Sequence, residues 1–427
     1  MHIGNITGDF RSLKNKSINH FCATILICLL PAFIVSSSIL INISIIVIGS
    51  LFLFDSLKNK KYEYFNNKIF ILLFIFFVFL IINLFFSINF QSSLPRSFGF
   101  LRFILLAVAI PYYIKENDFK YFKLILIIWV FIFFFISIDL LVEYFNGKNL
   151  LGMSNVFWGR LSGVMNDELK IGAYYLGFYF FTIAAIIKTF PNKKFLILLS
   201  IVAFTLISFL IGERANFIKV LFGLIILLIF WDKYKYKYKL LILSLMFILM
   251  SVFINTNHDL KNRFAGQFAS YILENGITYY YYNSQYGAHY ATSIKIFKNY
   301  PLTGIGIKNF MEECFKDDMK KYDDERFGSN KARCSNHPHQ LHFEILSQLG
   351  IFGYAMFLTF FIYFIGRGVF IYNKNKNILH LGALIFIFVY LFSPVPSGSF
   401  FTTFSASIFW INFALVLTFE GNKFNKT

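Results

Sequence analysis

Three histidines fall within six residues of the sequence, at His337, His339 and His342. Neutral imidazole is the side chain best suited to accept a proton near pH 7. The three lie where a long polar segment meets a strongly hydrophobic stretch, so the cluster indicates proton transfer on a substrate held where a membrane meets water. The alternative is that these histidines are polar residues that end a membrane span and have no chemical role.

Arginines form the second group of candidate site residues. Arg214 lies in a very short connection between two hydrophobic stretches, Arg263 follows a hydrophobic stretch, and Arg160, Arg96 and Arg102 lie beside others. A guanidinium carries a planar fork of donors that matches phosphate oxygens, and it stays charged when partly buried. Two or three together predict a site for a lipid-linked phosphate or diphosphate. For each one alone, contact with lipid headgroups or pairing with a neighbour is the alternative.

Two carboxylates, Asp167 and Glu168, precede the hydrophobic stretch at 171–187. They could hydrogen-bond an acceptor sugar, or they could cap a helix, because acidic side chains suit the positive end of the helix dipole. No metal site is evident, because no carboxylates or thiolates complete a ligand set around the histidines. The sequence also lacks a Gly-Lys-Ser/Thr phosphate-binding loop, which argues against a nucleotide-driven pump.

Four cysteines divide between two settings. Cys22 and Cys28 fall in the first hydrophobic stretch and are most simply buried apolar residues. Cys314 and Cys334 lie in the long polar segment, where a disulfide is plausible if the segment faces an oxidising compartment. Such a bond would hold the chain just before His337 in place; two free thiols are the alternative.

The elements that must position these residues are membrane helices. Hydrophobic residues make up 57% of the chain and charged residues only 15%, a balance that excludes a soluble domain. A helix needs an apolar stretch of about 17–22 residues to cross a bilayer. We therefore predict an all-α integral membrane protein with about twelve transmembrane helices. The expected spans are 21–35, 39–54, 69–86, 98–114, 121–142, 171–187, 195–211, 215–231, 240–254, 343–365, 378–393 and 401–419.

The connections between these spans fall into two sets of different charge. One set is rich in lysine, as at 58–61 and 233–239, and the positive-inside rule places it in the cytoplasm together with both termini. The other set includes the turn at 212–214 and the long segment 255–342. The net charge of +18 therefore comes from membrane topology and does not indicate nucleic-acid binding.

This topology predicts three parts of the chain. Residues 1–254 form a transmembrane bundle of nine spans, and residues 343–427 form three further spans and a cytoplasmic tail. Residues 255–342 form a large periplasmic loop domain that carries the histidine motif. Within it, residues 282–300 could form an amphipathic helix at the membrane surface.

The histidine segment resembles the signature of the O-antigen ligase/polymerase family. That signature is His, then Asn, Ser or Gln, nine residues, Gly, two residues, and Gly, Thr or Tyr. Here it is His339-Gln340, nine residues, Gly350, two residues and Gly353. The preceding Pro301-Leu302-Thr303-Gly304-Ile305-Gly306 resembles the family's approach segment. The turn Gly212-Glu213-Arg214 also resembles its arginine-bearing turn.

The resemblance implies a GT-C-type membrane glycosyltransferase that uses no metal or other cofactor. It would take a glycan from undecaprenyl diphosphate at the periplasmic face of the bacterial inner membrane. His339 would deprotonate the acceptor hydroxyl, Arg214 and Arg263 would neutralise the diphosphate, and the anomeric centre would be inverted. The expected substrate-binding residues are His337, Gln340, Arg102, Arg160, Asp167 and Glu168, and the expected structural residues are Gly350, Gly353, Cys314 and Cys334.

Three functions fit these features. An O-antigen ligase of lipopolysaccharide biosynthesis would transfer the glycan to lipid A–core. An O-antigen polymerase would use the same donor but a second lipid-linked glycan as acceptor. A lipid-linked oligosaccharide flippase would instead hide its cationic residues in a central cavity, whereas here they cluster at one face. The signature favours the ligase.

Overall fold

The computed structural model describes residues 17–116, 119, 121–154, 159–166, 168–231, 235–316, 333–392 and 394–420. Within these ranges the regular structure is helical, as predicted. The helices of the bundle are α2 (Ile18–Ser36), α3 (Ser38–Lys58), α4 (Lys68–Asn83), α5 (Phe90–Gly99), α6 (Leu101–Lys115), α7 (Phe122–Asn146), α8 (Ile171–Thr189), α9 (Lys194–Leu210), α10 (Arg214–Phe230), α11 (Tyr236–Thr256), α16 (Leu341–Asn375), α17 (Ile378–Phe392) and α18 (Thr403–Thr418). Those of the long connection are α12 (His258–Leu260), η5 (Lys261–Ser270), α13 (Tyr271–Asn283), α14 (Gln285–Asn299) and α15 (Phe310–Cys314).

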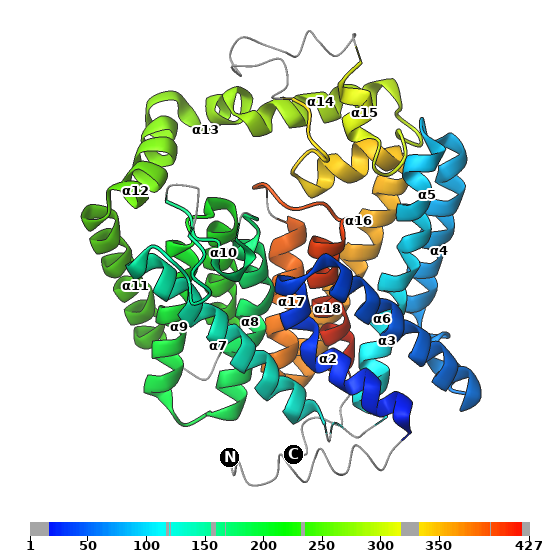
Figure 1. Ribbon diagram of the computed structural model, residues 1–427, viewed down its shortest axis with the longest axis horizontal. Coiled ribbons are helices and arrows are strands. Elements are labelled where there is room, and N and C mark those ends of the chain that lie inside the picture. The colour runs from blue at the N-terminus through cyan, green and yellow to red at the C-terminus, as the bar shows by residue number, and fades with distance from the viewer. Residues whose placement is uncertain are drawn as a thin grey trace.

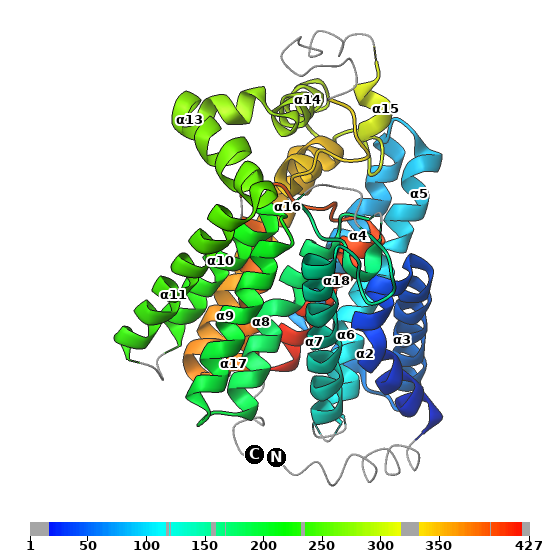
Figure 2. The same ribbon diagram turned by 60° about the vertical axis from the view of Figure 1, so that its left-hand side comes forward.

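The long helices run side by side as one bundle (Figures 1 and 2). Eight helical stretches in the described part of the chain are long and apolar enough to cross a membrane, so the protein is an integral membrane protein. Every predicted span overlaps a helix, although the span at 98–114 crosses the boundary between α5 and α6. The count of twelve stays a prediction, because α9, α10, α17 and α18 have 17, 17, 15 and 16 residues, fewer than the roughly 20 that a full crossing needs.

One predicted boundary is wrong. The sequence predicts a span from residue 98 after a connection over 87–97. Instead, residues 90–99 form α5, and α6 begins only at Leu101, after a break at Phe100. Asn89 starts α5, since its side chain accepts a hydrogen bond from the Ser92 amide at 3.0 Å.

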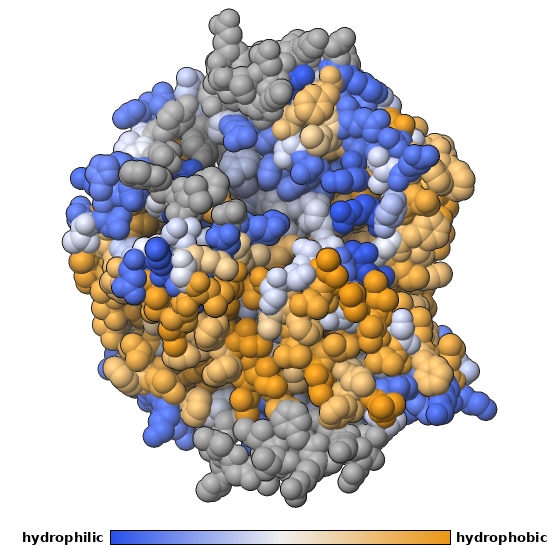
Figure 3. Space-filling model, viewed as in Figure 1, coloured by the Kyte–Doolittle hydropathy of each residue, from blue (hydrophilic) through white to orange (hydrophobic). Residues whose placement is uncertain are grey.

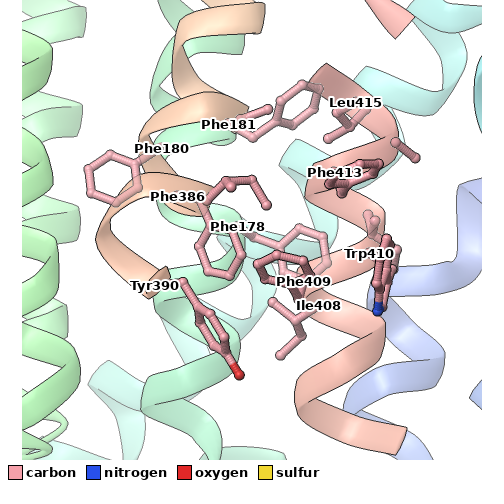
Figure 4. Close-up of a cluster of buried hydrophobic side chains, with 14 of the residues drawn as sticks. Phe178, Phe180, Phe181, Phe386, Tyr390, Ile408, Phe409, Trp410, Phe413 and Leu415 are labelled. Atoms are coloured by element: carbon pink, nitrogen blue, oxygen red, sulfur yellow. The ribbon is translucent and has the colours of Figure 1, made fainter. Parts of the chain in front are cut away.

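Aromatic side chains fill the centre of the bundle between α8, α17 and α18 (Figure 4). Phe364 and Phe413 stack with their ring centroids 4.1 Å apart. Small residues allow the close approach: a Cβ on Gly177 would lie 2.2 Å from the Ile408 side chain. Across this contact, the Asn412 amide donates to the Gly177 carbonyl at 2.9 Å. Helices in membranes associate through such small residues and interhelical hydrogen bonds.

Helices α13 to α15 lie across one end of the bundle (Figure 1). Helix α14 covers 285–299, so the helix predicted over 282–300 is confirmed. A small hydrophobic cluster of Ile296, Ile305 and Phe310 packs beneath it, separate from the main core. Hydrophilic side chains gather at this end, and a broad hydrophobic band covers the bundle below (Figure 3).

The opposite end of the bundle joins the first and last described helices. Asn19 at the start of α2 donates to Asp55 near the end of α3 at 2.7 Å. Lys115 at the end of α6 donates to the Leu417 carbonyl at 2.8 Å, and Arg367 pairs with Glu420 at 3.1 Å. The histidine segment and the turn at 212–214 lie at the other end of the bundle, remote from these groups.

Candidate active site

A large cavity lies under α13 and α14, at the end of the bundle that carries the histidine segment. Its volume is about 1290 Å³, above the roughly 300–1,000 Å³ of a typical small-molecule site. Five cationic side chains and one carboxylate line it, together with Ile, Leu, Phe and Tyr side chains. The cationic residues are Arg160, Arg214, Arg263, Lys295 and Lys298, and the carboxylate is Glu213. The cavity can therefore hold a ligand that is both anionic and apolar.

The three arginines come from distant parts of the chain and are fixed by backbone contacts. Arg263 Nε donates to the Gly212 carbonyl at 2.5 Å, and Arg214 donates to the Arg263 carbonyl at 3.3 Å. Arg160 pairs with Glu213 at 3.1 Å. Burial, followed by the charges of Arg160 and Arg214, lowers the pKa of Arg263 to about 10. The guanidinium still stays protonated at neutral pH, so the cavity keeps its positive charge.

A glycine makes this arrangement possible. Gly212 has φ +74°, and a Cβ there would lie 2.0 Å from the Gly159 carbonyl oxygen. Only glycine allows this approach, which sets the turn before Arg214 directly against the segment that carries Arg160.

His339 lies beside the cavity, in a group of four rings. Its ring centroid is 4.2 Å from that of His337, 5.2 Å from that of His289 and 5.8 Å from that of Tyr286, which lines the cavity. Its Nε2 lies 2.9 Å from Ser335 Oγ. Burial first, then the neighbouring His289, lowers the pKa of His339 to about 4, so the imidazole is neutral at pH 7 and can accept a proton.

The backbone of His339 is held in an unusual conformation. Its φ is +54°, in the left-handed region that non-glycine residues seldom adopt. The connection between α17 and α18 fixes it, because the Ser397 amide donates to the His339 carbonyl at 2.8 Å and Ser397 Oγ accepts from the Leu341 amide at 3.0 Å. Lys219 in α10 donates to the Pro396 carbonyl at 2.9 Å and so ties this connection to the bundle. Such strained backbone is common at active sites.

Other predicted site residues surround His339. The Gln340 side chain accepts from the Phe343 amide at 3.0 Å, which makes it the N-cap of α16, and it also lines the cavity. His342 lines the cavity as well, with its Nε2 2.6 Å from the Leu391 carbonyl. Burial lowers the pKa of His337 to about 3, and the charges of His339 and His289 act in the same direction.

Gly350 interrupts α16 with φ +64° and ψ −167°. The break frees backbone groups, and the segment 301–306 takes them up: the Gly306 amide donates to the Gln348 carbonyl at 2.8 Å, and the Ile351 amide donates to the Pro301 carbonyl at 2.9 Å. A Cβ on Gly350 would lie 2.3 Å from the Leu302 carbonyl oxygen. The two motif segments are thus one structural unit.

Among the described residues, three of the predicted substrate-binding residues do not line the cavity: His337, Arg102 and Glu168. Arg102 lies against Phe103 and 3.5 Å from Thr403 Oγ1. Glu168 pairs with Lys170 at 2.7 Å and does not cap α8; there the Gly172 amide donates to Glu213 instead, at 3.2 Å. Asp167 lies outside the described residues.

Cys314 and Cys334 form a disulfide. Arg333, next to Cys334, donates from Nε to the Cys314 carbonyl at 3.0 Å, and its own carbonyl contacts His289 Nδ1 at 2.9 Å. The bond therefore anchors the chain that enters the histidine segment.

Sequence reasoning missed His289, Tyr286 and Lys219. His289 and Tyr286 lie about 50 residues before the motif, and three residues apart on one helix face, which was the only available signal. Lys219 is an isolated lysine inside an apolar helix, and such a residue indicates a polar partner. Among the described residues, no set of three His, Cys, Asp or Glu side chains could hold a metal ion.

Comparison with known proteins supports one part of the chain directly. Residues 195–358 match a family described as O-antigen ligase, a stretch that contains Arg214, Arg263, His289, His339, Gly350 and Gly353. No curated protein matches the chain. The resemblance predicted from the histidine signature is thus confirmed over residues 195–358, the stretch that matches the O-antigen ligase family.

Proposed function

We propose that this protein is an O-antigen ligase, which transfers a glycan from undecaprenyl diphosphate to lipid A–core. One observation carries the proposal: three arginines from separate segments line one cavity with apolar walls, and the ring of His339 lies beside it in contact with Tyr286. A polyprenyl diphosphate combines a compact dianion with a long apolar chain. The cavity offers arginines for the diphosphate and apolar walls for the lipid chain.

The donor would bind with its diphosphate against Arg160, Arg214 and Arg263. A guanidinium binds two phosphate oxygens at once and remains charged when partly buried. The lipid would follow the apolar wall formed by Ile218 of α10 and Ile294 of α14. Lys295 and Lys298 would add positive charge along the same wall.

In the transfer step, His339 would take the proton of the acceptor hydroxyl as that oxygen attacks the anomeric carbon. The bond between this carbon and the diphosphate breaks, and the diphosphate leaves with the bonding electron pair. Arg214 and Arg263 stabilise the charge that develops on the leaving group. Attack opposite the diphosphate inverts the anomeric centre. In this scheme no metal is required.

The acceptor and the orientation belong to the same proposal. The lysine-rich connections favour an inner-membrane protein with both termini in the cytoplasm and the cavity facing the periplasm. A polymerase would use the same donor cavity and the same base and would differ only in its acceptor. A flippase would need the arginines but not the base.

The test uses purified full-length protein, an undecaprenyl diphosphate-linked glycan and lipid A–core, with a chelator present. We expect wild type to transfer the glycan and His339→Gln to lose about 10²–10⁴-fold in rate while it still binds the donor. His258→Gln is the matched control, because that side chain is 84% exposed at the surface.

Each outcome has a defined meaning. Extension of the lipid-linked glycan without transfer to lipid A–core would identify a polymerase. Full activity of His339→Gln would overturn the assignment of the base. Loss of wild-type activity with chelator, restored by a divalent metal, would overturn the metal-independent scheme.

A further inference from the structure

His289 is almost fully enclosed, with 1% of its surface exposed, and it lies on α14, where its ring contacts that of His339. Helix α14 is fixed at its start by Ser284, whose Oγ accepts from the Gly287 amide at 3.2 Å. Two turns further along, the hydroxyls of Thr292 and Ser293 donate to the carbonyls of Ala288 and His289 at 2.8 and 2.9 Å. The ring of His289 is therefore carried by an ordered helix and packs against the ring of His339.

The hydrogen bond of His289 fixes its tautomer. Nδ1 lies 2.9 Å from the carbonyl oxygen of Arg333, which can only accept. Nδ1 must then carry the proton, and in the neutral ring Nε2 carries the lone pair. Burial lowers the pKa of His289, so this neutral form prevails at pH 7.

The carbonyl that fixes this tautomer is itself anchored. Arg333 is followed by Cys334, whose disulfide to Cys314 joins the segment to α15. The Arg333 guanidinium donates to the Cys314 carbonyl at 3.0 Å, which closes the same loop a second time. A chain of contacts thus runs from the disulfide through Arg333 and His289 to His339.

We infer that His289 is a positioning residue for His339. The ring of His289 holds the ring of His339 in place and keeps the proton-accepting nitrogen of His339 available. This inference rests on the proposed function. The groups that face His339 are His289 from α14, Tyr286 from the same helix, and His337 and Ser335 from its own segment. At pH 7 none of these groups carries a negative charge that would stabilise a protonated His339.

The expected sign of the pH effect follows from this environment. With a pKa of about 4, His339 stays unprotonated down to nearly pH 5, so wild-type activity should fall only below that value. Without the His289 ring, water reaches His339 and its pKa rises toward the ordinary value of about 6.5. The acidic limb of the pH profile should then move to higher pH.

Two variants separate the contributions of the ring and of the hydrogen bond. His289→Asn keeps an N–H donor for the Arg333 carbonyl and removes most of the ring. We expect its acidic limb to move to higher pH by about one unit, and kcat on the plateau above the limb to fall on the order of tenfold because the base is no longer held in place, with KM for the donor within twofold. His289→Phe keeps a buried ring and removes the donor, so its limb should stay near the wild-type position while its melting temperature falls.

A third variant tests the anchor. The double variant Cys314→Ala and Cys334→Ala releases the segment that carries Arg333 from α15, so water should reach the histidines and the acidic limb should move to higher pH, by less than in His289→Asn. The control is Cys28→Ala, because Cys28 is a buried free thiol in α2, remote from the site.

The outcomes keep this inference distinct from the proposed function. If wild type transfers glycan and His289→Asn has an unchanged pH profile and kcat, the inference is wrong and the proposed function stands. If the variants lose activity only in proportion to lost folded protein, with an unmoved limb, His289 is merely structural. If wild type shows no transfer at all, the proposed function itself fails.

Discussion

The histidine segment has two flanks that differ in packing. The open flank is the cavity lined by Arg160, Arg214 and Arg263, with a volume of about 1290 Å³. The closed flank is the contact of segment 301–306 with Gly350 and α5, where backbone meets backbone with no room for a Cβ.

Charged residues on the two flanks are used differently. On the open flank the arginines bind backbone carbonyls through part of each guanidinium and line the cavity. On the closed flank, Arg96 donates to the Phe401 carbonyl at 3.3 Å and Arg102 lies on the Phe103 ring. The same residue type therefore lines a cavity on one side, where we propose that it binds the donor, and packs against protein groups on the other. We expect changes on the open flank to reduce activity and changes on the closed flank to reduce stability.

The largest effect is expected on the open flank. Arg214→Ala and Arg263→Ala should each lower the rate of glycan transfer by about 10²–10³-fold, because each removes a donor to the leaving diphosphate. Lysine at either position should restore only part of the activity, since it lacks the planar fork. Transfer by purified protein measures this, with Arg96→Ala as the control. Equal losses in the control would erase the distinction between the flanks.

The next effect concerns stability on the closed flank. Gly350→Ala should cost about 1–3 kcal/mol, because its backbone angles are open essentially to glycine alone and the Leu302 carbonyl fills the space. Thermal unfolding in detergent measures it. Gly366→Ala is the matched control in the same helix: no neighbour lies within 4 Å of its Cβ, so alanine should be stabilising by about 0.5–1 kcal/mol. A stable Gly350→Ala protein would contradict the role of the break.

A smaller effect is expected where the connection between α17 and α18 meets the bundle. Lys219→Met removes the hydrogen bond to the Pro396 carbonyl, which lets the residues that hold His339 shift. We expect kcat to fall about tenfold with little change in the KM for the donor. Lys374→Met, near the end of α16, is the control. A change in KM alone would mean that Lys219 acts on the donor cavity instead.

The smallest effect is expected for Arg102. Its guanidinium lies on an aromatic ring and near Thr403, outside the cavity lining. Arg102→Ala should change the transfer rate by less than about threefold, whereas its melting temperature should fall because packing is lost. A loss of transfer as large as that of Arg214→Ala would place Arg102 in the binding machinery.

Sequence reasoning identified the parts of the site that have local patterns. Every predicted span overlaps a helix, and the signature at His339 and Gly350 led to the family that matches residues 195–358. It failed where a pattern was ambiguous. The start of α6 was misplaced because Phe98 and Phe100 continue the apolar run of α6 toward α5, and hydropathy does not register where one helix ends and the next begins. Arg102 looked like Arg214 because both begin a span.

The sequence by itself determined the helical membrane class and supplied the cationic and histidine side chains of the candidate site, because composition, apolar length and residue type act locally along the chain. Only the tertiary structure decided which arginines meet and which imidazoles touch. Arg160 and Arg263 approach across Gly212, and His289 reaches His339 through a disulfide-anchored carbonyl. Contacts between residues about 50 or 100 positions apart depend on helix packing, and no local pattern encodes them.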